Sequence, residues 1–368
     1  MLWTSNPFSS MLSVKSSLSV IAVITVITLI TVITLITVIT LITVITLITV
    51  ITLTTERNMI MTKKEFTFLS CDKYTKIHVI TWIPSSSVKA VLQISHGMVE
   101  YVDRYDDFAH FLCEQGYLVV GQDHLGHGAS VQTNEDHGYF HSHNGNAIVV
   151  GDIHKLYNIM KKHFPSVPYF MLGHSMGSFL LRQYLQLYGN NLSGAIIVGT
   201  GYQPAPILLS GMLLCRIIAF FKGDRYRSEL VNKMAFGSFN RSFQPARTPY
   251  DWLSKDSEQV DLYASHPWCT FSFTVNAYYY MFRGMLTLTS SKNRKRIPNT
   301  LPILMLSGDM DPVGNFGKGV KQVFHQFQQM NMKDLSLKLY PNDRHEILNE
   351  TDRLIVYKDI LHWMEQHI

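Results

Sequence analysis

The sequence predicts an α/β fold in which a mostly parallel sheet is covered by helices on both faces and interrupted by one large insertion. Short apolar runs alternate with helical patterns through the first half of the chain, which is typical of buried parallel strands and their crossover helices. This alternation stops after about residue 200 and resumes near residue 300. We therefore divide the chain into an N-terminal extension (1–60), a core domain (61–200 and 300–368) and an insertion (201–299).

The composition favours a large folded core and argues against several classes of protein. Hydrophobic residues make up 46% of the 368 positions and charged residues 16%, so most of the chain can bury a core. The net charge of +5 is mild and no long basic stripe accompanies it, which argues against nucleic-acid binding. The cysteines are scattered and lack the spacing of a metal site, so we expect reduced thiols in or near the core. They are Cys71, Cys113, Cys215 and Cys269.

The expected elements follow from apolar runs and helical periodicity. The helix that begins at Tyr105, for example, carries its apolar residues at helical spacing and stops at Gly116. We expect strands at Glu65–Ser70, Lys76–Ile83, Val88–Ser95, Tyr117–Gly121, Tyr169–Leu172, Ala195–Gly199, Leu301–Ser307 and Leu335–Tyr340. We expect helices at Tyr105–Gln115, Ile148–His163, Ser178–Leu185, Lys318–Met330 and Asp352–Gln366.

The insertion has no clean rhythm of strands and helices. It contains the apolar segment Pro206–Phe221 and the aromatic segment Phe271–Phe282, with basic residues between and after them. An insertion of this length between two strands is most simply a largely helical cap over the strand ends.

The sequence Gly173-His174-Ser175-Met176-Gly177 lies between an expected strand and an expected helix. A serine at the apex of a sharp strand-to-helix turn is the context of a nucleophile, and the flanking glycines let the strand and the helix approach closely. The same pattern also fits a glycine-rich turn with an idle serine. A nucleophile needs a base and an acid, so their presence decides between the two interpretations.

Candidates for the base and the acid also follow strands, in the order Ser, Asp, His. His345 comes after the last expected strand, and Asp309 and Asp311 come after the one before it. We favour Asp311 over Asp309, because Pro312 stiffens the loop beyond Asp311. Ligands bind at the carboxyl ends of parallel strands, so we expect these side chains to meet there. The order Ser, Asp, His is associated with the α/β-hydrolase fold.

An ester hydrolase also needs backbone N–H groups that face the oxyanion of the reaction. We expect one from Met176, at the start of the helix that follows the serine, and the other from Met98, after His96-Gly97. We interpret the remaining histidines near these loops as structural. They are His96, His124, His127 and His174.

From about Met61 onward the chain resembles the monoacylglycerol lipases and bacterial lysophospholipases, a group of S33-like serine hydrolases with the α/β-hydrolase fold. The likeness lies in His96–Tyr105, Asp123–Ser130, the serine turn, Gly308–Asp311 and, within the cap, Pro245–Leu253 and Asp261–Tyr263. It implies a catalytic triad of Ser175, Asp311 and His345, with no metal or cofactor.

The resemblance also implies that the chain hydrolyses a carboxylic ester of a lipid with one acyl chain. A peptidase, a thioesterase or an acyltransferase would use the same triad, and a non-enzymatic binding protein is a further alternative. The apolar load of the cap suits an acyl chain. The head group, the acyl length and the oligomeric state stay open.

The N-terminal extension is a perfect repeat of Ile-Thr-Val-Ile-Thr-Leu from Ile24 to Leu53. Residues 19–53 are long and apolar enough for a membrane helix, which needs about 20 residues. More basic residues follow the repeat than precede it, so the positive-inside rule places the enzyme domain in the cytoplasm. Alternatively, translation starts at Met59 or Met61, the repeat is no part of the working protein, and the protein is cytoplasmic.

Overall fold

Eight strands form one mixed sheet in this computed structural model, which describes residues 7–368 and the side chains of residues 22–49 and 61–368. The strands are β1 (Met61–Leu69), β2 (Lys76–Pro84), β3 (Ala90–Ser95), β4 (Tyr117–Gln122), β5 (Tyr169–His174), β6 (Gly194–Val198), β7 (Ile303–Gly308) and β8 (Leu335–Tyr340). Their order across the sheet is β1-β2-β4-β3-β5-β6-β7-β8.

Only one edge of the sheet is antiparallel. The strand β2 pairs antiparallel with both β1 and β4, and every later pair is parallel. The register pairs Ser95 at the end of β3 with Gly173 near the end of β5. The loops that leave β3, β5, β7 and β8 therefore start from the same edge of the sheet, which is where parallel sheets bind their ligands.

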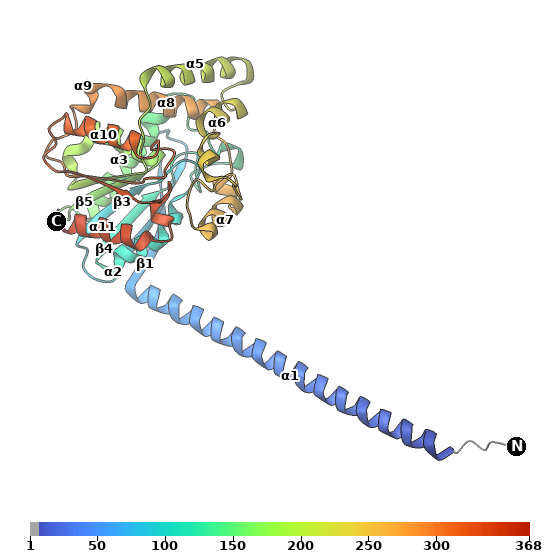
Figure 1. Ribbon diagram of the computed structural model, residues 1–368. Coiled ribbons are helices and arrows are strands. Elements are labelled where there is room, and N and C mark those ends of the chain that lie inside the picture. Colours follow the sequence, from blue (N-terminus) through green and yellow to red (C-terminus); the bar gives the residue numbers. More distant parts are fainter. Residues whose placement is uncertain (1–6) are drawn as a thin grey trace. The chain divides into compact units, whose positions relative to one another are not determined.

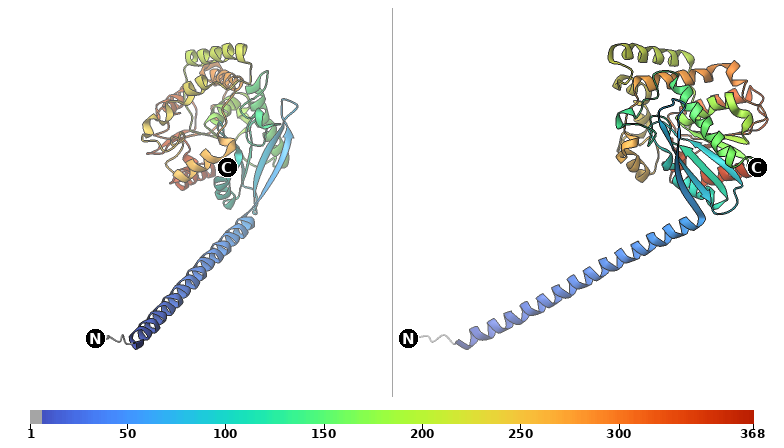
Figure 2. Two further views of the ribbon diagram at one scale, coloured as in Figure 1. Left: turned by 90° about the vertical axis from the view of Figure 1, so that its right-hand side faces the viewer. Right: turned by 180° about the vertical axis from the view of Figure 1, so that it is seen from behind.

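Helices cover both faces of the sheet (Figures 1 and 2). On one face lie α3 (Gly145–His163), α4 (Met176–Tyr188) and α10 (Lys318–Gln328), and on the other lie α2 (Asp106–Glu114) and α11 (Arg353–Glu365).

The core is correspondingly split into two layers by the sheet. Along β3, Val91 packs with the first group of helices, whereas Leu92 and Ile94 pack with the second. This is the alternation of side chains expected of an extended strand. Every residue of β3 to β7 is buried, which explains why these strands are near-continuous apolar runs in the sequence.

Between β6 and β7 the chain forms the helices of the cap. They are α5 (Ala205–Lys222), α6 (Glu229–Phe236), α7 (Ser257–Ser265), α8 (Val275–Thr289) and α9 (Ser291–Arg294). The helix α5 packs along α8, while its outer side leaves Leu213 and Phe220 exposed.

The first 59 residues form a unit separate from residues 60–368. The helix α1 runs from Pro7 to Ile60. Within it, each threonine from Thr28 to Thr49 donates its hydroxyl hydrogen to the carbonyl four residues earlier, as in the 2.9 Å bond from Thr31 to Ile27. The threonines of the repeat thus satisfy their own polar groups. By length and composition, two of the described helices could cross a membrane, namely Ala22–Thr49 and α5, and this is weak evidence.

The structure confirms the predicted fold class, including the helical cap and the apolar helix outside the core fold. The division of residues 61–368 at 200 and 300 stays a prediction. One detail was wrong, because Cys71 lies exposed in a turn, whereas Cys113, Cys215 and Cys269 are buried; the four thiols are free. The exposure follows from the turn Cys71-Asp72-Lys73 between β1 and β2, which the apolar character of cysteine alone does not reveal.

Gly177→Ala tests how closely α4 approaches β3. A Cβ at this position would lie 1.9 Å from the Ser95 carbonyl oxygen, which is backbone and cannot rotate away. We expect the free energy of unfolding to fall by about 1–3 kcal/mol or more, measured by denaturant titration. Gly151→Ala in α3 is the control, because its Cβ would meet only the side chain of Cys71. Equal stability of the two variants would contradict the close approach.

Candidate active site

Ser175 is held in a strained backbone conformation between β5 and α4. Its φ is 54° and its ψ is −119°, a region that non-glycine residues rarely occupy. Such strain persists only where the surroundings enforce it. Here a Cβ on Gly173 would lie 2.4 Å from the Gly177 carbonyl oxygen, so neither flanking position can hold a larger residue without movement. The turn lifts Ser175 to the carboxyl edge of the sheet.

His345 and Asp311 form a buried pair in the loops after β8 and β7. The Asp311 Oδ1 accepts a hydrogen bond from the His345 Nδ1 at 3.0 Å, and both side chains are almost fully buried. The N–H of Val313 and the hydroxyl of Ser307 also donate to the Asp311 carboxylate. Asp309 instead accepts from the N–H of Asn342 at 2.7 Å. Of the two predicted acids, the structure therefore brings only Asp311 to His345.

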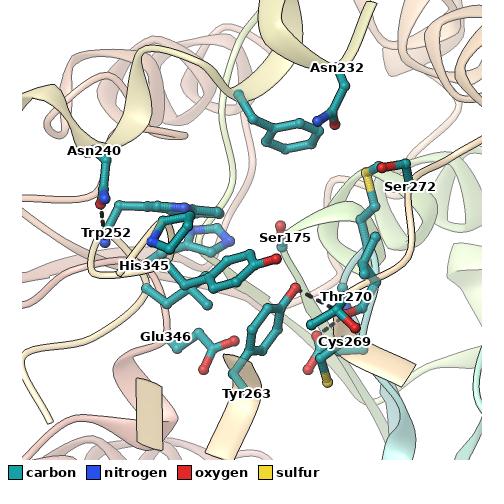
Figure 3. Close-up of a pocket in the computed structure, with 18 of the residues that line it drawn as sticks. Ser175, Asn232, Asn240, Trp252, Tyr263, Cys269, Thr270, Ser272, His345 and Glu346 are labelled. Atoms are coloured by element: carbon teal, nitrogen blue, oxygen red, sulfur yellow. Dashed lines mark hydrogen bonds between the residues drawn. The ribbon is translucent and has the colours of Figure 1, made fainter. Parts of the chain in front are cut away.

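Ser175 and His345 line the same cavity (Figure 3). Among the described residues, no hydrogen bond joins the Ser175 hydroxyl to the His345 ring. Nucleophile and base are often loosely spaced when no substrate is bound, so this geometry is compatible with proton transfer. The His345 ring also packs against the ring of Trp252 in the cap, with ring centroids 5.1 Å apart.

The loop after β3 passes directly over the serine. A Cβ on Gly97 would lie 3.1 Å from the Ser175 Cβ. Met98 and Met176 line a cavity together with Ser175. In the described part of the chain the Met98 N–H donates no hydrogen bond, and the Met176 N–H, as the first of α4, has no partner inside its helix. The two predicted oxyanion donors thus flank the serine with their N–H groups unused.

Two cavities meet at Ser175. The first has a volume of about 390 Å³ and a mixed lining that includes His345, Asn240, Tyr263 and Thr270. The second has a volume of about 220 Å³ and is lined mainly by apolar side chains of α5, α6 and α8. Its lining includes Leu208, Leu214, Val231, Met234, Met281 and Phe282. Both cavities are also lined by Met98 and Phe236.

A cluster of buried charges, which contributes Glu100, His174 and Glu346 to the lining of the first cavity, was missed by the sequence analysis. The Arg104 guanidinium binds both oxygens of Glu346 at 2.6 and 2.7 Å and also contacts Glu100 at 2.9 Å. Glu100 in turn contacts His174, the residue before Ser175, at 3.3 Å. The spacing of Glu100 and Arg104 by four residues was a visible signal, whereas the contact with Glu346 spans most of the chain.

The charges in this cluster shift one another's pKa values. Burial alone would raise the pKa of Glu100, but the hydrogen bond from His174 and the Arg104 charge hold it well below its ordinary value. Burial also opposes the charge of Glu346, and the Arg104 charge outweighs it, so the pKa of Glu346 is lowered. For His174 the hydrogen bond to Glu100 outweighs burial and raises the pKa. The cluster therefore stabilises the charged forms of these three members.

The other predicted structural histidines lie outside both cavities. The rings of His96 and His124 pack in a tilted arrangement with centroids 4.2 Å apart, and His127 lies against them. Burial lowers the pKa of all three, so they are neutral side chains that pack the loops behind the site. Within the residues that the structure describes, no group of three or more His, Cys, Asp or Glu side chains is placed to hold a metal ion.

Comparison with known proteins identifies the family. Residues 86–352 match the family model described as serine aminopeptidase, S33. The monoglyceride lipase of Mus musculus is 26% identical over 78% of this chain and 86% of its own length. The monoacylglycerol lipase of Mycolicibacterium smegmatis is 25% identical over 83% of this chain and 99% of its own length.

Solved structures give the same result for the fold. A thermostable carboxyl esterase from Bacillus coagulans, solved in complex with glycerol, superimposes with a TM-score of 0.78 and 27% identity over 83% of this chain and 99% of that chain. A soluble variant of the monoglyceride lipase from Saccharomyces cerevisiae, with 20% identity, superimposes with a TM-score of 0.65 over 83% of this chain and 94% of its own, which is a likeness of fold. With the family match extending over most of the core and the cap, the chain belongs to the S33 serine aminopeptidase family of α/β-hydrolases.

Proposed function

We propose that this protein cleaves carboxylic esters of lipids that carry a single acyl chain, such as monoacylglycerols or lysophospholipids. Its family and its lipase and esterase relatives make it a carboxylic-ester hydrolase. The observation that carries the finer proposal is the position of Ser175, where a mixed cavity and an apolar cavity meet.

This arrangement suits a substrate with two unlike ends. The acyl chain enters the apolar cavity between α5, α6 and α8, where its burial is favourable by about 0.8 kcal/mol per methylene group. The head group occupies the first cavity, where side chains such as Asn240 and Thr270 offer hydrogen bonds. The ester carbonyl then lies beside Ser175.

The reaction proceeds by nucleophilic catalysis. His345, oriented by Asp311, takes the proton of Ser175 as the serine oxygen attacks the ester carbonyl. The Met98 and Met176 N–H groups stabilise the oxyanion, aided by the positive end of the α4 dipole. His345 then gives the proton to the leaving alcohol, and water repeats the sequence on the acyl-enzyme.

Three other reactions use the same residues. A peptidase, a thioesterase and an acyltransferase differ from the proposed esterase in the bond attacked or in the acceptor of the acyl group. The apolar cavity favours the lipid ester over a small peptide amide, because a peptide offers less apolar surface to bury there.

We further propose that residues 19–53 of α1 anchor the protein in a membrane with the core domain in the cytoplasm. The apolar stretch Ala22–Thr49 and the internal hydrogen bonds of its threonines support this, as does the excess of basic residues after the helix. We also infer that residues 61–200 and 300–368 act as the catalytic core and 201–299 as the substrate-selecting cap.

A hydrolysis panel tests the substrate class. With monoacylglycerol, lysophospholipid, a short p-nitrophenyl ester and a proline amide, we expect the highest kcat/KM for a single-chain lipid ester and none for the amide. Ser175→Ala should abolish hydrolysis and labelling by a fluorophosphonate, whereas Ser265→Ala in α7 should leave both intact. Preference for the amide would contradict the lipid proposal, and undiminished labelling of Ser175→Ala would contradict the nucleophile.

The choice of acid is tested by two matched variants. Asp311→Asn should lower kcat by a factor on the order of 10⁴ with little change in KM, because the amide favours the wrong tautomer of His345. Asp309→Asn, two residues away, should keep kcat within a few-fold of the original, measured with the best ester of the panel. A larger loss in Asp309→Asn would reassign the acid.

Membrane anchoring is tested by fractionating cells that express either the full chain or a chain starting at Met59. We expect the full chain to remain with membranes after alkaline carbonate washing, because such a wash releases peripheral proteins, and the shorter chain to be released. Recovery of the full chain in the soluble fraction would refute the anchor. An intact mass of the native protein that starts at Met59 or Met61 would do the same.

A further inference from the structure

The buried charges at the first cavity connect three loops that are far apart in the sequence. Glu100 accepts a hydrogen bond from the Gly97 N–H, next to the proposed oxyanion donor Met98. Arg104 binds Glu346, the neighbour of His345, through both carboxylate oxygens. The cluster of Glu100, Arg104, His174 and Glu346 thus touches the oxyanion loop, the nucleophile turn and the loop of the base.

Both ring nitrogens of His174 face hydrogen-bond acceptors. Its Nε2 lies 3.3 Å from the carbonyl oxygen of His345, which can only accept. Its Nδ1 lies 3.3 Å from the Glu100 Oε1 and 3.2 Å from the Tyr105 hydroxyl oxygen. The Tyr105 hydroxyl donates its one hydrogen to Glu100 at 3.0 Å, so it is left as an acceptor toward His174. A ring that donates from both nitrogens is an imidazolium.

The charges of the cluster balance only in that state. Glu100 and Glu346 supply two negative charges and Arg104 one positive charge, and the Glu100, Glu346 and His174 side chains are at most 6% exposed. A net charge in such surroundings is costly, because burial removes its hydration. A proton on His174 brings the sum to zero.

From this geometry we propose that His174 is a permanent buried imidazolium at working pH, and that it, Glu100, Arg104 and Glu346 are positioning residues of the proposed hydrolysis. The inference rests on the proposed function for its catalytic consequence. The ring of His174 holds the backbone of His345 from one side, and Glu100 holds the oxyanion loop from the other. The side chain of Tyr263, stacked on Arg104, adds a hydrogen bond to the Val99 carbonyl of the same loop.

Loss of the His174 proton would loosen this arrangement. The Nδ1 would become an acceptor facing the Glu100 carboxylate, and the two lone pairs would repel each other. Glu100 would then move, and with it the loop that carries Gly97 and Met98. Because the pKa of His174 is raised in the folded protein, its charge is present below that pKa and is lost as the pH rises through it. Activity should therefore decline on the alkaline side.

Several titratable groups face the His174 ring and contribute to this behaviour. They are His96, Glu100 and Tyr105 after β3, and His345 and Glu346 after β8, with Arg104 bridging the two carboxylates. Tyr105 stays neutral because burial and the Glu100 charge raise its pKa well above the ordinary value. Glu346 adds to the stabilisation of the His174 charge, so its removal should shift the alkaline decline to lower pH.

The charge state is tested on the full chain in detergent with ¹⁵N-labelled histidine. We expect a histidine signal with both ring nitrogens protonated at neutral pH, and we expect this histidine to titrate at alkaline pH. The signal should be absent in His174→Gln. Tyr105→Phe, which removes only one hydroxyl near the ring, identifies the same signal by its shift if His174→Gln does not fold. A neutral His174 ring at neutral pH would overturn the proposal.

The positioning role is tested by pH profiles of kcat and KM for the best ester of the panel. Gln at 174 keeps a donor toward the His345 carbonyl but carries no charge. We expect His174→Gln to lower kcat ten- to hundredfold, which is on the scale of a misplacement of about 1 Å, to change KM less, and to lack the alkaline decline. Glu346→Gln should move that decline to lower pH. An alkaline decline that persists unchanged in both variants would overturn the proposal.

The control variant is Glu114→Gln, which removes another carboxylate that faces a histidine, at 3.5 Å from the His110 ring and far from the site. It should leave the profile unchanged. The two proposals fail separately. A protein that hydrolyses no ester but shows the His174 imidazolium would refute the function alone, and an active esterase with a neutral His174 would refute this inference alone.

Discussion

The close approach of α4 to β3 is the constraint on which the site depends. Gly177 lies against the Ser95 carbonyl with no room for a Cβ, and this forces the turn between β5 and α4 to be as tight as it is. Ser175 takes up the strain with a positive φ. The same approach brings the loop after β3 over the serine, so that Met98 and Met176 flank one side chain. The strained turn at Ser175 therefore places both the proposed nucleophile and the proposed oxyanion donors.

Buried charge is the second constraint, and it runs between loops rather than along elements. Burying the charges around Arg104 is expensive, and such clusters persist only when each charge is paired and hydrogen-bonded. The cluster meets this condition, since the Arg104 guanidinium donates two hydrogen bonds to Glu346 and a further one to Glu100. An apolar replacement would pack as well, but it would not fix the distance between the loop of Gly97 and the loop of His345. We interpret the charges as fixing the relative positions of loops that no shared secondary structure connects.

Much of the fold was predictable because its signals are local. Buried parallel strands such as β5 and β7 are six residues long and mainly apolar, and the serine turn has its glycines at fixed offsets. The pairing of Asp311 with His345 was predictable from the order of the motifs, with Pro312 and the resemblance both favouring Asp311 over Asp309. The contact of Arg104 with Glu346 was not predictable, because it joins positions separated by 242 residues. In addition, a glutamate in a loop is normally exposed to solvent. The exposure of Cys71 was missed for a similar reason, since residue type outweighed its place in a turn.

In the proposed function, the core domain carries out the reaction and the cap selects the substrate. This difference explains why the type of reaction was easier to predict than the identity of the substrate. The proposed reaction depends on a few polar atoms at the ends of strands, and the fold sets the order in which these residues follow one another along the chain. In the proposed function, substrate choice depends on the cavity between α5, α6 and α8, to which many apolar residues contribute by their packing rather than by their identity. Replacing Leu214 by another apolar residue of similar volume, for example, would leave the hydrophobic pattern of the sequence unchanged. The mixed cavity beside His345 has the same property, because its lining is assembled from the cap and three core loops. The head group that fits can therefore be inferred only from the lining of the complete cavity. The residues that would select it become identifiable only once the cap is placed over Ser175.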